Sequence, residues 1–130
     1  MANNYKIKGV STMSRKTIVF DFDGVIHRYA KGWLDGSIYD IPTPGIEEVL
    51  NNLKSLGYEI IIVSTRCTTD GGIDSIKNWL SVYGSLNYID DVRSTKPPAM
   101  VYVDDRAITF DGNDMTNLVN QIVNFKPWNK

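Results

Sequence analysis

The chain has 130 residues, enough for one compact domain with a single core and too few for two. Its formal net charge is −1, so no overall positive field attracts nucleic acid or an anionic membrane. The single cysteine, Cys67, excludes an intramolecular disulfide and fits a reducing cytosol. No apolar run approaches the roughly 18 residues of a spanning helix, and the polar N-terminus lacks the centre of a signal peptide. We therefore expect a cytoplasmic protein with no membrane partner.

The first 15 residues show neither helical nor strand periodicity, and we expect a flexible leader before one domain over residues 16–130. A short apolar, β-branched run over residues 17–21 then predicts a buried strand. Residues 24–42 are rich in glycine and aromatic residues. They are expected to form a small irregular flap, with a tight turn and a hairpin.

The middle of the chain predicts two helices with a strand between them. Thr43, followed by a proline, matches a helix N-cap, and apolar residues at helical spacing then continue to a stop at Gly57. The run over residues 58–63 predicts a second buried strand, apolar enough for the middle of a parallel sheet. Apolar residues over 73–80 predict another amphipathic helix, which ends near Gly84.

The last third of the chain predicts shorter elements. Residues 87–89 could form a third strand, residues 99–103 a fourth, and residues 108–110 an edge strand. Apolar residues between positions 118 and 125 recur at helical spacing and predict a closing helix. Alternating strands and helices predict an α/β domain with a mostly parallel sheet and right-handed crossovers.

Polar residues follow three of the predicted strands at their carboxyl ends. They are Asp21 and Asp23 after the first strand, Ser64 and Thr65 after the second, and Asp104 and Asp105 after the fourth. Ligands of open parallel sheets bind beyond these ends, so one shared site is expected. Single aspartates often end strands, but grouped carboxylates repel one another and are costly without a cation. Mg²⁺ prefers oxygen ligands, and Asp21, Asp104 and Asp105, with a backbone carbonyl near Asp23, could bind it.

Residues 18–27, Ile-Val-Phe-Asp-Phe-Asp-Gly-Val-Ile-His, carry the strongest signal in the sequence. Their Asp-x-Asp-Gly pattern resembles the first motif of the haloacid dehalogenase-like (HAD) superfamily. Residues 60–65, Lys96 and residues 101–105 resemble the second, third and fourth motifs, in the order of the family. The resemblance covers about residues 17–112. It implies a three-layer, doubly wound, Rossmann-like core with a mostly parallel sheet.

The resemblance also implies roles for individual residues. Asp21 would attack phosphorus and form an aspartyl-phosphate, and Asp23 would protonate the leaving alcohol and then activate water. The Ser64 hydroxyl and backbone N–H groups after Asp21 would bind phosphate oxygens, while Lys96 would neutralise charge. Thr65 and Arg66 join the substrate-binding candidates, although a solvated loop role for Arg66 is an equal alternative. The metal-binding set is Asp21, Asp23, Asp104 and Asp105, with Mg²⁺ as the cofactor.

The reaction class and the absence of a large cap domain follow from two further features. An aspartate two positions after the nucleophile favours phosphoryl transfer over dehalogenation within the superfamily. Only 19 residues separate Gly24 from Pro44, and 30 separate Thr65 from Lys96, so both cap insertion points are short. The chain is thus predicted to be an Mg²⁺-dependent phosphatase acting on a phosphomonoester. A nucleotide, a sugar phosphate and a polynucleotide end are the substrate classes left open.

Other functions and weaker residue assignments stay open at this point. Phosphotransfer between substrates and a non-catalytic or regulatory binding role are the alternatives, and a homo-oligomer could cover the open site. His27, the only histidine, is expected to have a surface or turn role rather than to tune Asp23. Trp33 and Tyr39 could stack on a substrate ring, but burial within the flap is favoured. Lys96 lies only eight positions before Asp104, which predicts a lysine on a loop.

Overall fold

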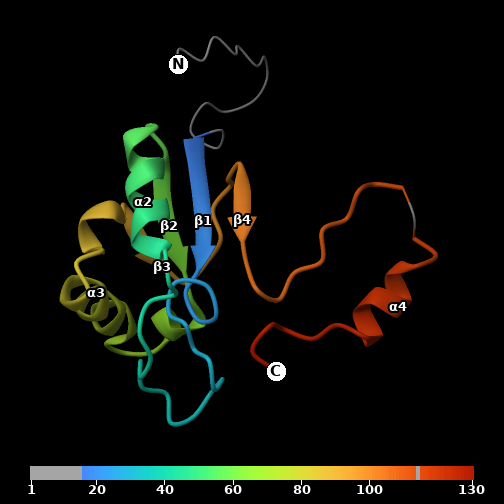
Figure 1. Cartoon of the computed structure of the whole chain (residues 1–130), viewed down its shortest axis with the longest axis horizontal. Coiled ribbons are helices and arrows are strands. Elements are labelled where there is room, and N and C mark those ends of the chain that lie inside the picture. The colour runs from blue at the N-terminus through green and yellow to red at the C-terminus, as the bar shows by residue number, and fades with distance from the viewer. Residues whose placement is uncertain (1–15, 114) are drawn as a thin grey trace.

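The computed structural model describes residues 16–113 and 115–130, and its centre is a four-stranded, wholly parallel sheet (Figure 1). The strands are β1 (Thr17–Asp21), β2 (Glu59–Val63), β3 (Asp91–Arg93) and β4 (Val101–Val103). They lie in the order β3-β2-β1-β4, so β1 and β2 are central. The predicted α/β class with a parallel sheet is confirmed. The predicted leader, residues 1–15, lies outside the described residues.

Two helices pack on one face of this sheet. They are α2 (Ile46–Ser55) and α3 (Gly72–Val82), and their apolar side chains join one core cluster with alternate residues of β1 and β2. The chain passes from β1 to β2 to β3 in one direction, and right-handed crossovers place both connecting helices on the same side. The opposite face presents a smaller apolar cluster of Val19, Ile61 and Val63, against which Ala99 packs.

Three local predictions are wrong. Helix α2 has Gly45 (φ 87°) at its N-cap, while the buried Thr43 hydroxyl has no hydrogen-bond partner in the part of the chain that the structure describes. Residues Leu86–Tyr88 form a short 3₁₀ helix, η2, and the third strand begins at Asp91 instead. The Ile60 N–H donates to the Asp90 carboxylate and Asp90 N–H donates to the Ile60 carbonyl, so tertiary contacts set where this strand starts. Residues 108–110 form no strand, which leaves β4 at the sheet edge.

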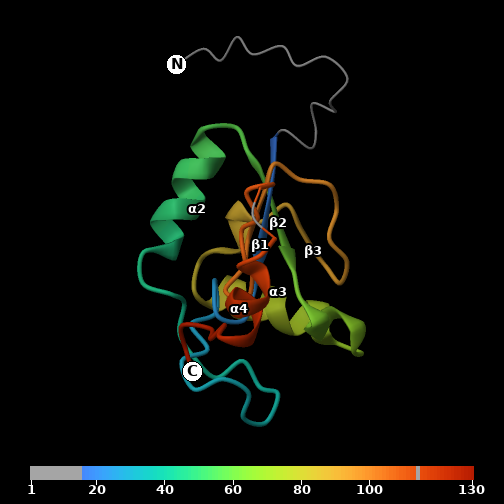
Figure 2. The ribbon, with the colours of Figure 1, turned by 90° about the vertical axis from the view of Figure 1, so that its right-hand side faces the viewer.

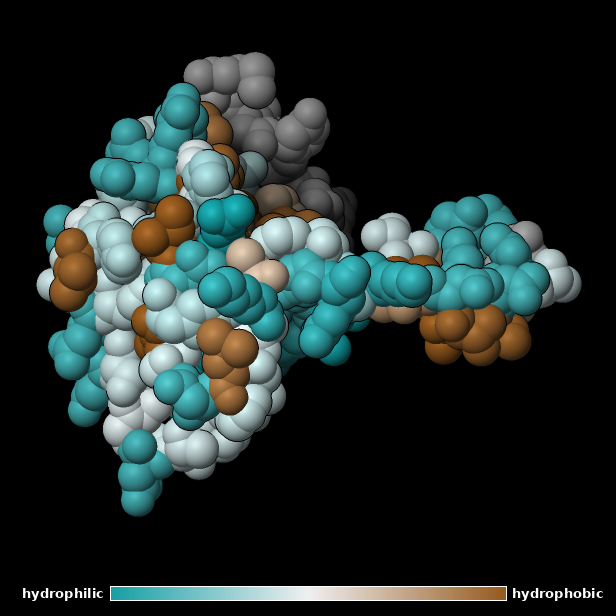
Figure 3. Space-filling view, turned by 60° about the horizontal axis from the view of Figure 1, so that its bottom comes forward, coloured by the Kyte–Doolittle hydropathy of each residue, from teal (hydrophilic) through white to brown (hydrophobic). Residues whose placement is uncertain are grey.

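The segment after β4 leaves the body of the domain and returns to it. The predicted last helix exists as α4 (Leu118–Val123), but it projects from the sheet instead of closing the core (Figure 1). Its apolar side chains Val119, Ile122 and Val123 are exposed, and Figure 3 shows hydrophobic atoms gathered on one side of the projecting lobe. The C-terminal residues then lie beside the flap (Figure 2).

The C-terminus is attached to the flap by two hydrogen bonds. The Trp128 indole N–H donates to the Gly24 carbonyl at 2.8 Å, and the Asn129 side-chain amide donates to the Tyr29 carbonyl at 2.9 Å. These contacts join residues about a hundred positions apart, so periodicity within the sequence did not predict them. Across the described part of the chain, none of the helices has the length and apolar character needed to cross a membrane.

Candidate active site

Three aspartates meet at the carboxyl edge of the sheet. Asp21 is the last residue of β1, and Asp104 and Asp105 directly follow β4. Strand pairing aligns Phe20 with Val103, so the segments that follow β1 and β4 leave the sheet side by side. Carboxylate oxygens of Asp21, Asp104 and Asp105 all lie within 4.8 Å of one another. The structure thus groups three of the four aspartates in the predicted metal set.

This acidic cluster is electrostatically unfavourable by itself. Burial raises the pKa of Asp21 to about 7, helped by the charge of Asp104 and by the hydrogen bond and charge of Asp105. One carboxylate oxygen of Asp105, Oδ1, is buried and has no hydrogen-bond partner among the described residues. A donor set made only of carboxylate oxygens suits a hard divalent cation such as Mg²⁺. The cluster therefore has the composition, spacing and unsatisfied oxygen that such a cation would complete.

The glycine after Asp23 is needed for this geometry. Gly24 has a φ of 86°, in the left-handed region that side chains rarely adopt. A Cβ at this position would collide with the Asp105 carboxylate. The Gly24 N–H donates to the His27 carbonyl at 2.8 Å, which closes the turn after β1. Glycine thus lets the turn approach the acidic cluster closely.

The Asp23 side chain does not join the acidic cluster. One carboxylate oxygen accepts a hydrogen bond from His27 Nδ1 at 2.7 Å, and the other accepts from Arg66 Nε at 2.8 Å. Burial opposes ionisation of Asp23, but these hydrogen bonds and the positive charge of Arg66 outweigh it and lower the pKa of Asp23. Asp23 is therefore an ionised carboxylate at neutral pH, separate in its contacts from Asp21.

His27 belongs to the turn after β1, as expected, but the alternative of a surface position is wrong. Its side chain is fully buried and packs against the rings of Phe22 and Trp79, with centroids 5.5 and 5.6 Å away. His27 Nε2 accepts the backbone N–H of Asp40 at 3.0 Å, so the hydrogen on the ring lies on Nδ1 and is donated to Asp23. His27 thus fixes the orientation of the Asp23 carboxylate.

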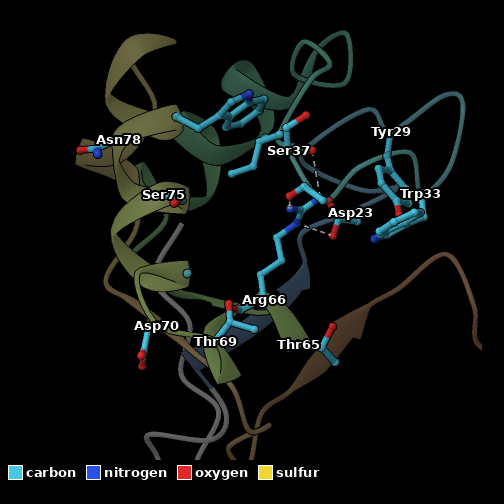
Figure 4. Close-up of a pocket in the computed structure, with 14 residues that line it drawn as sticks. Asp23, Tyr29, Trp33, Ser37, Thr65, Arg66, Thr69, Asp70, Ser75 and Asn78 are labelled. Atoms are coloured by element: carbon cyan, nitrogen blue, oxygen red, sulfur yellow. Dashed lines mark hydrogen bonds and ion pairs between the residues drawn. The ribbon is translucent and has the colours of Figure 1, made fainter.

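Arg66 connects Asp23 to the flap. Besides Asp23, its guanidinium donates to the carbonyls of Gly36 at 2.6 Å and Ser37 at 3.5 Å. Figure 4 shows Arg66 reaching from the end of β2 toward Asp23, with dashed lines at its guanidinium. These contacts contradict the solvated loop role of Arg66, and its role in substrate binding stays a prediction. In this structure Arg66 holds Asp23 and the flap together.

The remaining predicted site residues occupy the same edge of the sheet. Ser64 follows β2, is buried, and accepts the Arg66 N–H through Oγ at 3.1 Å, which leaves its hydroxyl hydrogen to donate. Thr65 is exposed and lines the cavity described next. Lys96 Nζ lies 3.7 Å from the Asp104 carboxylate and, with Asp21, borders a pocket of about 20 Å³. The predicted loop position of Lys96 is confirmed.

A much larger cavity of about 820 Å³ opens on the other side of Asp23. The flap and α3 form its walls, and Arg66 and Thr65 lie at its base (Figure 4). Trp33 lines it and is 70% exposed, so the expected burial of this side chain within the flap is wrong. Tyr39 instead stays within the flap, where its hydroxyl donates to the Gly32 carbonyl at 2.7 Å.

Several residues that support the site gave no recognisable signal in the sequence. Asp40 positions His27 through its backbone N–H, and the Trp79 indole donates to the Asp40 carbonyl at 3.1 Å. Trp128 anchors the C-terminus to Gly24. Each contact depends on elements that only the folded chain brings together.

A scan against protein-family models, a search of curated proteins and a search of solved structures each found no match. The motifs within the chain and the geometry of the site are therefore the basis for the function proposed below.

The acidic cluster predicts a pH-dependent response to Mg²⁺. Folding raises the pKa of Asp21 from 3.8 to about 7, so the folded chain retains a proton that the unfolded chain releases. The free energy of unfolding of the metal-free protein should consequently fall as the pH rises through this interval. We expect Mg²⁺ to raise the melting temperature more at pH 8 than at pH 5, as measured by differential scanning fluorimetry. Equal melting temperatures with Mg²⁺ and with EDTA at pH 8 would contradict the metal site.

Proposed function

We propose that this chain is an Mg²⁺-dependent phosphohydrolase of the HAD-like superfamily, which cleaves a phosphomonoester through an aspartyl-phosphate on Asp21. One observation carries the proposal. Asp21 lies among carboxylates that suit a cation, while Asp23, two residues along the chain, is held apart by His27 and Arg66. The two carboxylates thus have different environments, as nucleophilic and acid/base roles require.

Asp21 and the acidic cluster fit the nucleophilic role. A bound Mg²⁺ would supply the positive charge that offsets the repulsion between a phosphate and the attacking carboxylate. Asp104 and Asp105 would hold the cation together with one oxygen of Asp21, which leaves the other Asp21 oxygen to attack. Lys96, beside Asp104, adds positive charge on the same side, and the buried Ser64 hydroxyl can donate to a phosphate oxygen.

The proposed reaction has two steps. In the first, an Asp21 oxygen bonds to phosphorus, the ester P–O bond breaks, and the departing oxygen takes a proton from Asp23. In the second, water attacks phosphorus, its proton passes to Asp23, and the bond between Asp21 and phosphorus breaks. The net change converts ester and water into alcohol and inorganic phosphate.

The contacts of Asp23 fit the second step most directly. Its lowered pKa keeps it ionised in the free protein, and only the ionised carboxylate can accept a proton from water. A phosphate bound beside Asp23 would bring negative charge, and like charge raises the pKa of a carboxyl group. Asp23 could then carry the proton that an alkoxide leaving group needs.

The three-layer core and the absence of a large cap domain are part of this proposal. Helices α2 and α3 supply one helical layer, and the apolar face formed by Val19, Ile61 and Val63 is available for the other layer of a three-layer HAD core. The absence of a large cap fits the short flap that the structure shows over residues 24–42. The cytoplasmic location inferred from the sequence stays a prediction.

The direct test is phosphate release from acetyl phosphate, a substrate with no ring and a small leaving group. We expect turnover with Mg²⁺ and none with EDTA, because the acidic cluster repels phosphate unless a cation is bound. Addition of excess Mg²⁺ to the EDTA-treated protein should restore the rate. Failure to release phosphate from acetyl phosphate and from a panel of phosphomonoesters would overturn the hydrolase proposal.

A further inference from the structure

The cavity beyond Asp23 is the part of the site that the proposed chemistry does not use. Its volume of about 820 Å³ lies within the range of roughly 300–1,000 Å³ that is usual for small-molecule sites. Asp23 lines this cavity, whereas the acidic cluster lies outside it. A phosphate bound at Asp21 would therefore direct its ester group past Asp23 into the cavity.

One wall of the cavity is aromatic. Trp33 is 70% exposed although it is a large apolar side chain, so a flat ligand ring would cover surface that now faces water. Tyr29 also lines this wall and has a φ of 56°, the only positive φ of a non-glycine residue in the described part of the chain. Its ring packs against those of His27 and Tyr39, with centroids 5.4 and 5.9 Å away. Figure 4 shows Tyr29 and Trp33 close together on the flap side.

The facing wall carries two uncharged polar side chains. Ser75 and Asn78 lie on α3, across the cavity from Trp33 (Figure 4). Within residues 16–113 and 115–130, neither the Ser75 hydroxyl nor the Asn78 amide has a hydrogen-bond partner. These groups can donate to and accept from the polar edge of a ring that stacks on the opposite wall.

The charges of the lining argue against a second anionic group on the ligand. Among the described residues that line the cavity, Arg66 is the one cation, and Asp23 and two flap carbonyls already bind its guanidinium. Asp70, the other charged lining residue besides Asp23, is an anion. A bisphosphate or a phosphorylated carboxylic acid would bury negative charge here without a matching cation.

We propose that the alcohol released from the phosphate is uncharged and carries a flat, hydrogen-bonding aromatic ring, as a nucleoside does. The substrate class is then a nucleoside monophosphate, with the base between the aromatic wall of the flap and the polar wall of α3. This inference rests on the proposed phosphohydrolase function. Cleavage gives the nucleoside, which keeps the ester oxygen and gains a proton, and inorganic phosphate.

The first test compares substrates that share a phosphate but differ in the remainder. Adenosine 5′-monophosphate should give a kcat/KM about ten- to a hundred-fold above that of ribose 5-phosphate, since stacking of one base contributes about this much. Adenosine 3′,5′-bisphosphate should be poorer than the monophosphate because of its second anion. Equal kcat/KM values for the nucleotide and the sugar phosphate, with acetyl phosphate still hydrolysed, would overturn the inference and leave the phosphohydrolase function standing.

Variants in the flap test whether Trp33 is responsible for the preference for the nucleotide. Trp33→Ala should lower kcat/KM for the nucleotide about tenfold and leave the rates with ribose 5-phosphate and acetyl phosphate unchanged, while Trp33→Phe should keep most of the nucleotide activity. Leu34→Ala is the matched control, because Leu34 is an exposed flap residue outside the cavity lining. Loss of all three activities in Trp33→Ala, or no loss, would contradict the assignment.

A binding measurement separates the two proposals if no phosphate ester is hydrolysed. Calorimetry with adenosine should show binding that is weakened in Trp33→Ala and unchanged in Leu34→Ala. That result would retain the ring-binding site although the hydrolase function had failed. No detectable binding of adenosine to the wild-type protein in this case would overturn the ring-binding site as well.

Discussion

Asp21→Asn is expected to lower Mg²⁺-dependent phosphate release from acetyl phosphate by at least about a thousand-fold, because it removes the nucleophile. The amide is close in size to the carboxylate but is a far poorer nucleophile, so no phosphoenzyme should form. The measurement is the steady-state rate, together with mass spectrometry of the protein quenched in acid during turnover. Phosphate release at the wild-type rate would contradict the role of Asp21.

The stability of Asp21→Asn distinguishes loss of chemistry from loss of fold. The substitution removes one of three clustered negative charges, and burial and repulsion already hold the pKa of Asp21 near 7. The metal-free variant should therefore melt at the same temperature as the wild type or higher at pH 8, with a smaller increase on addition of Mg²⁺. Asp74→Asn, on the exposed side of α3, is the matched control and should change neither the rate nor the response to Mg²⁺.

Asp23→Asn is expected to lower turnover by about a hundred- to ten-thousand-fold, the usual contribution of a general acid or base. Asp23→Asn and Asp21→Asn should differ in whether phosphorylated protein accumulates. Acetate leaves acetyl phosphate without needing a proton, so Asp21 can still be phosphorylated, while water attack on the phosphoenzyme lacks its base. Mass spectrometry should detect phosphorylated protein in Asp23→Asn and none in Asp21→Asn.

Because Asp23 accepts hydrogen bonds from His27 and Arg66, the experiment needs a control that shows whether Asp23→Asn is folded. In Asp23→Asn, Arg66 loses its carboxylate partner but keeps the flap carbonyls of Gly36 and Ser37. A circular dichroism spectrum and a melting curve would show whether the flap and core persist. Asp35→Asn, on the exposed part of the flap, should retain the wild-type rate and form no stable phosphoenzyme. A folded Asp23→Asn protein that turns over normally would refute the acid/base assignment.

Much of the fold was predictable because it depends on short-range patterns. The apolar runs at 17–21 and 58–63 predicted β1 and β2, with the second strand one residue shorter than expected. Helical spacing likewise predicted α2, α3 and α4, although the Thr43 cap and the start of β3 were wrong. Periodicity identifies an element, but its ends depend on neighbours such as the Ile60–Asp90 pair, which lie far apart in the sequence.

The placement of α4 shows a second limit of prediction from sequence periodicity. The spacing of its apolar residues is a property of the helix alone, and it predicted the helix correctly. Whether those residues are buried depends on what the helix packs against. In the structure Val119, Ile122 and Val123 are exposed on the projecting lobe, and the Trp128 indole bonded to Gly24 brings the chain back to the flap.

By itself, the sequence determined which carboxylates could share an edge of the sheet. Asp21 and Asp104–Asp105 end parallel strands, and the carboxyl ends of such strands meet whatever the intervening loops do. The tertiary structure alone decided the environment of Asp23, since Arg66 is 43 positions away in the sequence and reaches it from the paired end of β2. The same holds for His27, whose burial depends on packing against Trp79 of α3. Strand order thus fixes where backbone ends lie, whereas hydrogen-bond partners and pKa values depend on side chains that only the packed chain brings within contact distance.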